Sequence, residues 1–193
     1  MDNQFLRQIS GPSSEPVTTS EIKNYCRINT SADDVEIDGM IKAARDSIED
    51  ETGIVMVQQT YEYQISALIN GMRLPIGPLN SLDSVEYYDE NNNLKTLSSN
   101  SYRVYNNDRI AYFNLTDNYD KPSDIGDRSY PWIITFKAGW SSSKDVPDRL
   151  KVAIKMLVCH WYDWRGVAVN ASMSHIPQAI DRIISQYKIP LVI

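Results

Sequence analysis

Apolar side chains near the start of the chain recur every three or four residues, which predicts amphipathic helices. A short helix is predicted to begin after Thr18, because Thr18 and Glu21 have the spacing of a capping box. A longer helix is predicted to begin at Asp33 and Asp34 and to end at Gly53. The apolar stripe of this longer helix comprises Ile37, Met40, Ile41, Ala44 and Ile48.

The pattern changes to alternation between residues 58 and 138. Tyr61, Tyr63 and Ile65 alternate with polar residues, and polar clusters such as 89–93 separate this run from later apolar and aromatic runs. Alternation interrupted by turn-forming residues predicts roughly five to seven short antiparallel strands joined by hairpins.

Helical spacing returns after Pro147, a residue that suits the first turn of a helix because its missing N–H costs nothing there. This helix is predicted to end near Gly166, and a last short helix is predicted to end at Pro190. We expect these helices to pack with the N-terminal ones, since neither pair can bury its apolar stripe alone. The stripe after Pro147 comprises Leu150, Ala153, Ile154, Leu157, Val158 and Trp161.

The sequence therefore predicts an α+β fold, in which a helical bundle from the N- and C-terminal helices carries an inserted antiparallel β subdomain. Low periodicity and several Gly, Pro and Ser residues predict a flexible arm at the N-terminus. The expected segments are 1–16 for the flexible arm, 17–57 for the first half of the bundle, 58–140 for the β subdomain, 141–188 for the second half of the bundle and 189–193 for a C-terminal tail.

The amino-acid composition disfavours general nucleic-acid binding and a membrane partner. A net charge of −6 disfavours general affinity for a phosphate backbone. No apolar run is long enough to span a bilayer, and the first residues lack the apolar core of a secretory signal, so we expect no membrane partner. Cys26 and Cys159 are interpreted as buried thiols of a reducing compartment rather than as a disulfide.

Candidate catalytic residues are few. His160 adjoins Cys159, but neighbours on a helix point about 100° apart, so a structural role is favoured. His175 lies in the linker before the last helix and is interpreted as a capping or solvated residue. A dyad of Cys26 and His160 across the bundle remains an alternative, although no nucleophile motif accompanies it.

Motifs for phosphate, redox or metal chemistry are missing from the sequence. In the polar segment 114–129, Asp117-Asn118-Tyr119-Asp120 with Asp124 and Asp127 has the ligand type of a calcium loop, but the Gly and distal Glu of an EF-hand are missing. A solvated acidic loop is therefore favoured over a calcium site. We expect no catalytic residue, no metal and no cofactor.

Negative charge is concentrated in the longer N-terminal helix. Residues 33–52 contain eight acids and two bases, a balance equal to the −6 of the whole chain. The alternatives are a solvated helix face and an acidic surface on a ring or on the wall of a channel through which DNA slides. The acids are Asp33, Asp34, Glu36, Asp38, Asp46, Glu49, Asp50 and Glu51.

A series of short sequence pieces keeps a recognisable order and spacing over about residues 16–165. The pieces are Pro16-Val17-Thr18, Arg27-Ile28, Asp33-Asp34, Ile41-x-Ala43-Ala44-Arg45-x-x-Ile48-Glu49-x-x-Thr52-Gly53, Gln58 to Glu62, Leu74 to Leu79 with Ser84-Val85, Phe136-x-Ala138-Gly139-Trp140, Val146-Pro147-x-x-Leu150-x-x-Ala153-Ile154 and His160-Trp161-Tyr162. Together they resemble the head–tail connector proteins of tailed bacteriophages and gene transfer agents, also called adaptor or head completion proteins.

The resemblance implies a structural virion protein without catalytic activity. Members of the family form a ring, typically a dodecamer, beneath the portal protein at the capsid vertex, and this ring extends the DNA channel and carries the tail. The implied partners are further copies of the chain, the portal protein and a tail or tail-completion protein, while DNA passes without sequence-specific binding. The implied location is the head–tail interface of the virion, after synthesis in the cytoplasm of a bacterial host.

The C-terminal tail is the expected portal-binding segment, because this end of family members commonly reaches the portal. Its apolar residues also suit strand addition or groove filling, and packing against its own bundle is the alternative. A protein-binding module outside the virion, such as an assembly chaperone or a regulator, is the alternative function. The tail comprises Ile189, Pro190, Leu191, Val192 and Ile193.

Overall fold

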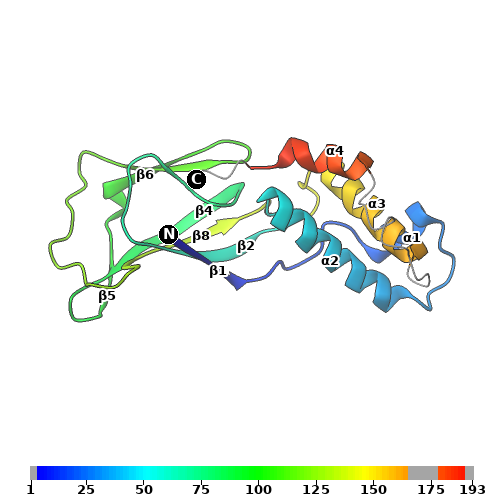
Figure 1. Ribbon diagram of the computed structural model, residues 1–193, viewed down its shortest axis with the longest axis horizontal. Coiled ribbons are helices and arrows are strands. Elements are labelled where there is room, and N and C mark those ends of the chain that lie inside the picture. The colour runs from blue at the N-terminus through cyan, green and yellow to red at the C-terminus, as the bar shows by residue number, and fades with distance from the viewer. Residues whose placement is uncertain (1–3, 165–177, 190–193) are drawn as a thin grey trace. The chain divides into compact units, whose positions relative to one another are not determined.

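The computed structural model describes residues 4–164 and 178–189 (Figure 1). The chain divides into two compact units. The strand unit combines the N-terminal residues up to Ser13 with Gln58–Gly139, and the helix unit combines Ser14–Val57 with the described residues from Trp140 onward. Strands and helices each occupy one unit, so the predicted α+β class is confirmed.

The strand unit contains two antiparallel sheets. A five-stranded sheet has the order β1-β2-β8-β4-β5, and a three-stranded sheet has the order β3-β7-β6. The strands are β1 (Gln4–Ser10), β2 (Gln59–Ile65), β3 (Met72–Arg73), β4 (Leu79–Tyr88), β5 (Leu94–Thr96), β6 (Tyr102–Asn106), β7 (Ala111–Leu115) and β8 (Trp132–Ala138), with a 3₁₀ turn η1 at Ser99–Ser101.

Strand β8 lies between β2 and β4, and its consecutive residues Trp132, Ile133 and Ile134 are all buried although they alternate between the two faces of the sheet, which explains its near-continuous apolar sequence. Ile134, Phe136 and Ala138 are fully buried, and Trp132 is nearly so. The Trp132 ring packs against Tyr87 of β4 with ring centres 5.2 Å apart. The core of the larger sheet is therefore built around β8.

Strand β1 corrects the prediction of a flexible N-terminal arm. Gln4–Ser10 pairs antiparallel with β2 at the edge of the larger sheet. Arg7 donates to Glu62 of β2 at 3.0 Å, while Phe5 and Ile9 stay about half exposed. The segment shows neither helical spacing nor clean alternation, and the strand that orders it lies far away in the sequence, so no local pattern reveals it.

The helix unit contains α1 (Thr19–Cys26), α2 (Asp34–Thr52), α3 (Asp148–Trp164) and α4 (Gln178–Tyr187). Helix α3 contacts each of the other three helices. The capping box is present, because Thr18 accepts the N–H of Glu21 and Glu21 accepts the N–H of Thr18. Gly53 ends α2 in the left-handed region, with φ of 72°. Both predicted helix-boundary signals are therefore observed.

The predicted core residues of α2 and α3 form much of the interior of the helix unit. Met40 and Trp161 are only half-buried. The others are buried: Ile37, Ile41, Ala44, Ile48, Leu150, Ala153, Ile154, Leu157 and Val158.

A disulfide between Cys26 and Cys159 corrects the prediction of two free thiols. It joins the end of α1 to α3, with the two Cα atoms 5.7 Å apart. The prediction rested on compartment and helical context, which do not reveal that the packing of α1 on α3 brings the two residues together. The pairing also removes the alternative of a Cys26–His160 dyad, because no free thiol remains at position 26.

Candidate interaction surfaces

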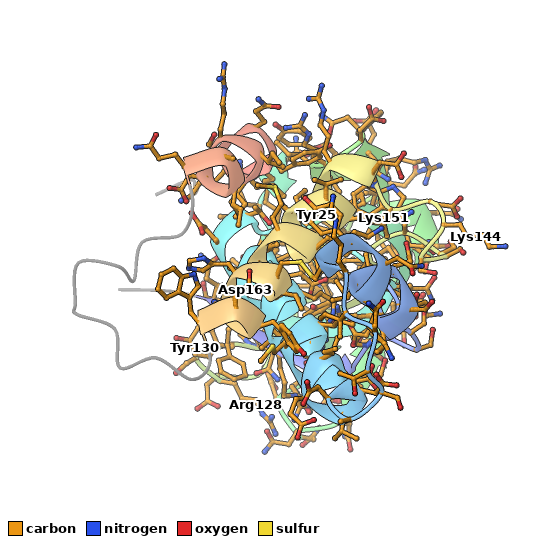
Figure 2. The ribbon with its side chains drawn as sticks, turned by 90° about the vertical axis from the view of Figure 1, so that its right-hand side faces the viewer. Tyr25, Arg128, Tyr130, Lys144, Lys151 and Asp163 are labelled. Atoms are coloured by element: carbon orange, nitrogen blue, oxygen red, sulfur yellow. A yellow bond between two sulfur atoms is a disulfide. The ribbon has the colours of Figure 1, made fainter. Side chains whose placement is uncertain are left out.

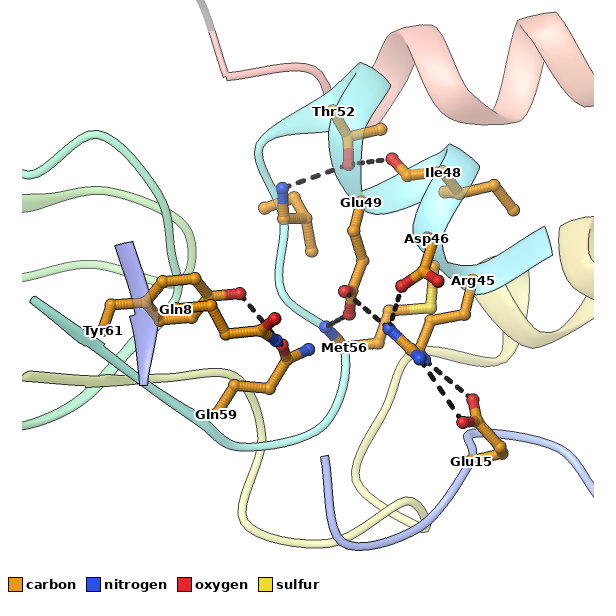
Figure 3. A network of polar contacts seen from close by, with 11 residues as sticks. Gln8, Glu15, Arg45, Asp46, Ile48, Glu49, Thr52, Met56, Gln59 and Tyr61 are labelled. Atoms are coloured by element: carbon orange, nitrogen blue, oxygen red, sulfur yellow. Dashed lines mark hydrogen bonds and ion pairs between the residues drawn. The ribbon is translucent and has the colours of Figure 1, made fainter. Parts of the chain in front are cut away.

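A buried guanidinium joins the segment before α1 to helix α2 (Figure 3). The Arg45 side chain is 6% exposed, and its Nε donates to Glu15 at 2.7 Å. Its Nη1 donates to Asp46 at 2.6 Å and to Glu49 at 3.1 Å. Burial alone would lower the pKa of Arg45, but the hydrogen bond to Glu15 and the surrounding carboxylate charges raise it above its ordinary value.

Glu49 extends this cluster, since it also accepts the backbone N–H of Met56 at 2.6 Å. The arrangement therefore fixes both the approach to α1 and the segment after α2. This role of Arg45 was not predicted from the sequence, where the residue appeared as a base of the acidic helix and as part of the family resemblance. The available signal was the spacing of Arg45 and Glu49, which places an ion pair on consecutive helical turns.

A second set of polar contacts joins α1 and the start of α2 to α3. Lys155 donates to Glu21 at 2.9 Å, and the Tyr162 hydroxyl donates to Asp33 at 2.6 Å. The backbone hydrogen bond from Thr18 is the main cause that holds the pKa of Glu21 below its ordinary value, with a further contribution from Lys155. These contacts lie in the same helix unit as the disulfide.

The turn that leads into α3 is held by its own helix. Lys151 donates from Nζ to the carbonyl oxygen of Lys144 at 3.0 Å (Figure 2). This contact positions the polar segment before Pro147 and leaves Lys144 itself exposed at the surface.

Most of the predicted acidic surface is used inside the helix unit. Only Glu36 and Asp50 of the eight acids are exposed without a hydrogen bond or ion pair to the described part of the chain. The engaged pairs are Asp33 with Tyr162, Asp34 with Lys23, Asp38 with Thr19, Asp46 and Glu49 with Arg45, and Glu51 with Lys188. The free acidic surface is therefore much smaller than the charge count suggests.

A groove of about 630 Å³ lies between α3 and α4. Arg149 of α3 and Arg182 of α4 both line it, and both are exposed. Arg149 donates to the side chain of Gln186 at 3.0 Å. The complete lining is Arg149, Gln178, Ala179, Arg182, Ile183 and Gln186. The groove thus combines two cationic groups with a small apolar surface.

In the strand unit, Lys95 bridges Asp89 and Asp124. The hydrogen bond from the backbone N–H of Asn93 is the main cause that holds the pKa of Asp89 below its ordinary value. The hydrogen bond from Lys95 similarly lowers the pKa of Asp124. Among residues 4–164 and 178–189, no three His, Cys, Asp or Glu side chains gather as a metal site requires. Asp124 is thus held in an ion pair with Lys95.

His160 is half-buried and lies against Trp164, with ring centres 6.3 Å apart. His175 and the linker around it lie outside the described residues. Ile189 is buried and donates its N–H to the carbonyl of Thr52 at 2.7 Å, so the predicted tail boundary moves to residue 190. The rest of the predicted tail lies outside the described residues. No described helix is long and apolar enough to cross a membrane.

The sequence model of one protein family, head completion proteins, matches residues 15–189. The chain belongs to the head completion protein family. This membership confirms the resemblance inferred from the order of the short motifs. The matching family is one of head completion proteins rather than of enzymes. No match was found among curated proteins.

The fold of this head completion protein is similar to solved chains of gene transfer agent (GTA) particles. One is from the neck of an empty particle computed with C6 symmetry (TM-score 0.77, 17% identity), and one is from the virion of a native particle (TM-score 0.78, 17% identity). A third is from the neck of a native particle computed with C12 symmetry (TM-score 0.72, 15% identity). Each comparison covers 98% of this chain and 97% of the other.

Proposed function

We propose that this protein is a structural component of a virion at the head–tail junction. Copies form a ring that joins the capsid portal to the tail and extends the DNA channel. The observation that carries the proposal is the family match over residues 15–189. Similarity to neck chains over almost the whole length supports it.

The ring is supported by the symmetry of the similar particles. The necks that contain the similar chains were computed with C6 and C12 symmetry, which is the symmetry of rings. We propose that this chain also assembles around such an axis, as a dodecamer. In this proposal the four helices form the bundle that builds the ring, and the sheets decorate it.

Passage of DNA without sequence-specific binding agrees with the charge of the protein. The net charge is −6, and a protein that binds duplex DNA tightly needs several cations placed against phosphates. We propose that residues 190–193 contact the portal.

The proposal is tested by removing the chain from a producing strain. DNA-filled heads without tails are expected, and purified protein added to those heads is expected to restore tail attachment. Heads that lack the portal protein serve as the control and should take up neither ring nor tail. Normal tailed particles formed without the chain would refute the proposal. A chain that is required but absent from purified particles would instead identify an assembly chaperone.

A further inference from the structure

We propose that the α3–α4 groove of one copy receives the exposed face of α2 from the neighbouring copy. The inference rests on the proposed ring and goes beyond it by naming the two surfaces that meet. The contact is head to tail, because the two surfaces are different parts of one helix unit. Such heterologous contacts close into a ring when the rotation between copies divides a full turn.

The groove presents positive charge that no carboxylate among residues 4–164 and 178–189 neutralises. Arg149 donates to the neutral side chain of Gln186, and no carboxylate of the described residues pairs with Arg149 or Arg182. The carboxylate of Asp148, next to Arg149 in sequence, does not line the groove, and its side chain is 98% exposed. Guanidinium groups have five donors each, so both arginines keep donors available for a partner.

The remainder of the lining favours a protein helix as occupant. Ala179 and Ile183 give the groove an apolar strip, and Gln178 and Gln186 flank it with amide groups. An apolar strip within a polar border is the usual make-up of a groove that binds an amphipathic or small-faced helix. Nucleic acid backbones would use the two arginines but leave the apolar strip unmatched.

The exposed face of α2 has the complementary properties. Glu36 and Asp50, the two acids of α2 with no hydrogen bond or ion pair to the described part of the chain, lie along one line of the helix. Gly39, Ala43 and Ser47 lie between them and are exposed. These short side chains let another helix approach closely, and the acids at either end of the face carry the charge opposite to that of the groove.

Gly39 supplies an independent reason to place a partner on this face. Glycine inside a helix costs about 1 kcal/mol relative to alanine. A Cβ atom at Gly39 would meet no atom of its own chain within 4 Å, so the fold of one copy does not require glycine here. Val35, one turn earlier, is 81% exposed. Close contact with a second copy accounts for both features.

The test uses two charge-reversal variants of the full chain. The groove variant is R149E/R182E, and the α2 variant is E36K/D50K. Neither touches the Arg45 cluster or the disulfide. The matched controls change equally exposed charges elsewhere: K121E/K144E for the groove variant and D108K/D117K for the α2 variant. Circular dichroism melting checks that every variant folds, and the neutral variant R149Q/R182Q replaces the groove variant if charge reversal prevents folding.

Ring formation on portal-bearing heads is measured by electron microscopy as a function of protein concentration. Each variant alone is expected to raise the concentration for half-complete rings at least about tenfold, because like charges then face each other. The controls are expected to change it less than about twofold. An equimolar mixture of the two variants is expected to recover assembly, since every contact pairs opposite charges in a ring in which the two variants alternate.

The possible results distinguish failure of the proposed interface from failure of the proposed ring. Wild-type protein that never forms rings on heads refutes the proposed function and this interface together. Rings formed normally by either variant, or a mixture no better than the variants alone, refute the interface and leave the ring intact. A groove variant that forms normal rings but loses DNA would show that the groove binds phosphates, and this would also overturn the proposal.

Discussion

Replacing Arg45 by Met removes the cation at the centre of the buried cluster and keeps most of its volume. The main cost is the carboxylates left behind, because Glu49 and Glu15 have side chains only 10% and 21% exposed. Asp46 contributes little, since its side chain is 63% exposed and solvent screens it. Removing one partner of a buried ion pair typically costs about 3–5 kcal/mol. We expect the lower end, about 3 kcal/mol, because one of the three carboxylates is solvated.

Urea unfolding followed by circular dichroism measures this loss, since the helix signal comes from the helix unit. A loss of about 3 kcal/mol corresponds to a melting temperature roughly 6–12 °C lower for a chain of this size. Lys42→Met on the same helix is the matched control, because Lys42 is exposed, and it should change stability by less than about 0.5 kcal/mol. If Arg45→Met unfolds at the wild-type urea midpoint, the cluster does not stabilise the fold and the reasoning is wrong.

Three further predictions concern the same helix unit. Replacing Cys26 and Cys159 by Ala should lower the free energy of unfolding by about 2–4 kcal/mol under oxidising conditions and leave it unchanged when dithiothreitol is present; equal stability in both conditions would contradict a structural disulfide. Glu21→Gln should lower the melting temperature at pH 7: the folded pKa of Glu21 is below its unfolded value of 4.5, so its stabilising effect is complete above pH 4.5 and is lost as the pH falls through the folded pKa. A difference that persists in strong acid would refute this. Truncation after Ile189 should abolish portal docking and leave the melting temperature unchanged. Truncation after Lys188 should abolish docking and also lower the melting temperature, because it removes the buried Ile189. Normal docking by either truncated chain would exclude residues 190–193 as the portal contact.

Local signals predicted the helices well, because the residues that define each boundary are neighbours in sequence. The capping box at Thr18 and Glu21 and the left-handed Gly53 both appear where the spacing places them. The apolar stripe of α2 is buried for the same reason: a helix with one apolar face has only one way to turn it inward. These features depend on a single element and need no knowledge of its partners.

Features that depend on distant partners could not be predicted. Strand β1 exists because β2 pairs with it, and the Cys26–Cys159 link joins residues separated by 133 positions. The contacts of the acidic residues of α2 could not be predicted for the same reason. The number of these acids suggested an open acidic surface, but counting charges does not tell which of them meet Tyr162, Lys23 or Arg45 in the fold.

Several residues of the motifs that carried the family resemblance have structural roles within the helix unit. Thr18 caps α1, Arg45 and Glu49 form the buried cluster, and Gly53 ends α2. Of the four residues of the proposed ring interface, Asp50 and Arg149 occupy unspecified positions of those motifs, and Glu36 and Arg182 lie outside them. A motif match therefore reports a shared fold and a shared role, while the surfaces that neighbouring copies use need structural evidence of their own. It follows that changing these four residues should alter assembly without unfolding the chain, whereas changing Arg45 should lower its stability whether or not a ring can form.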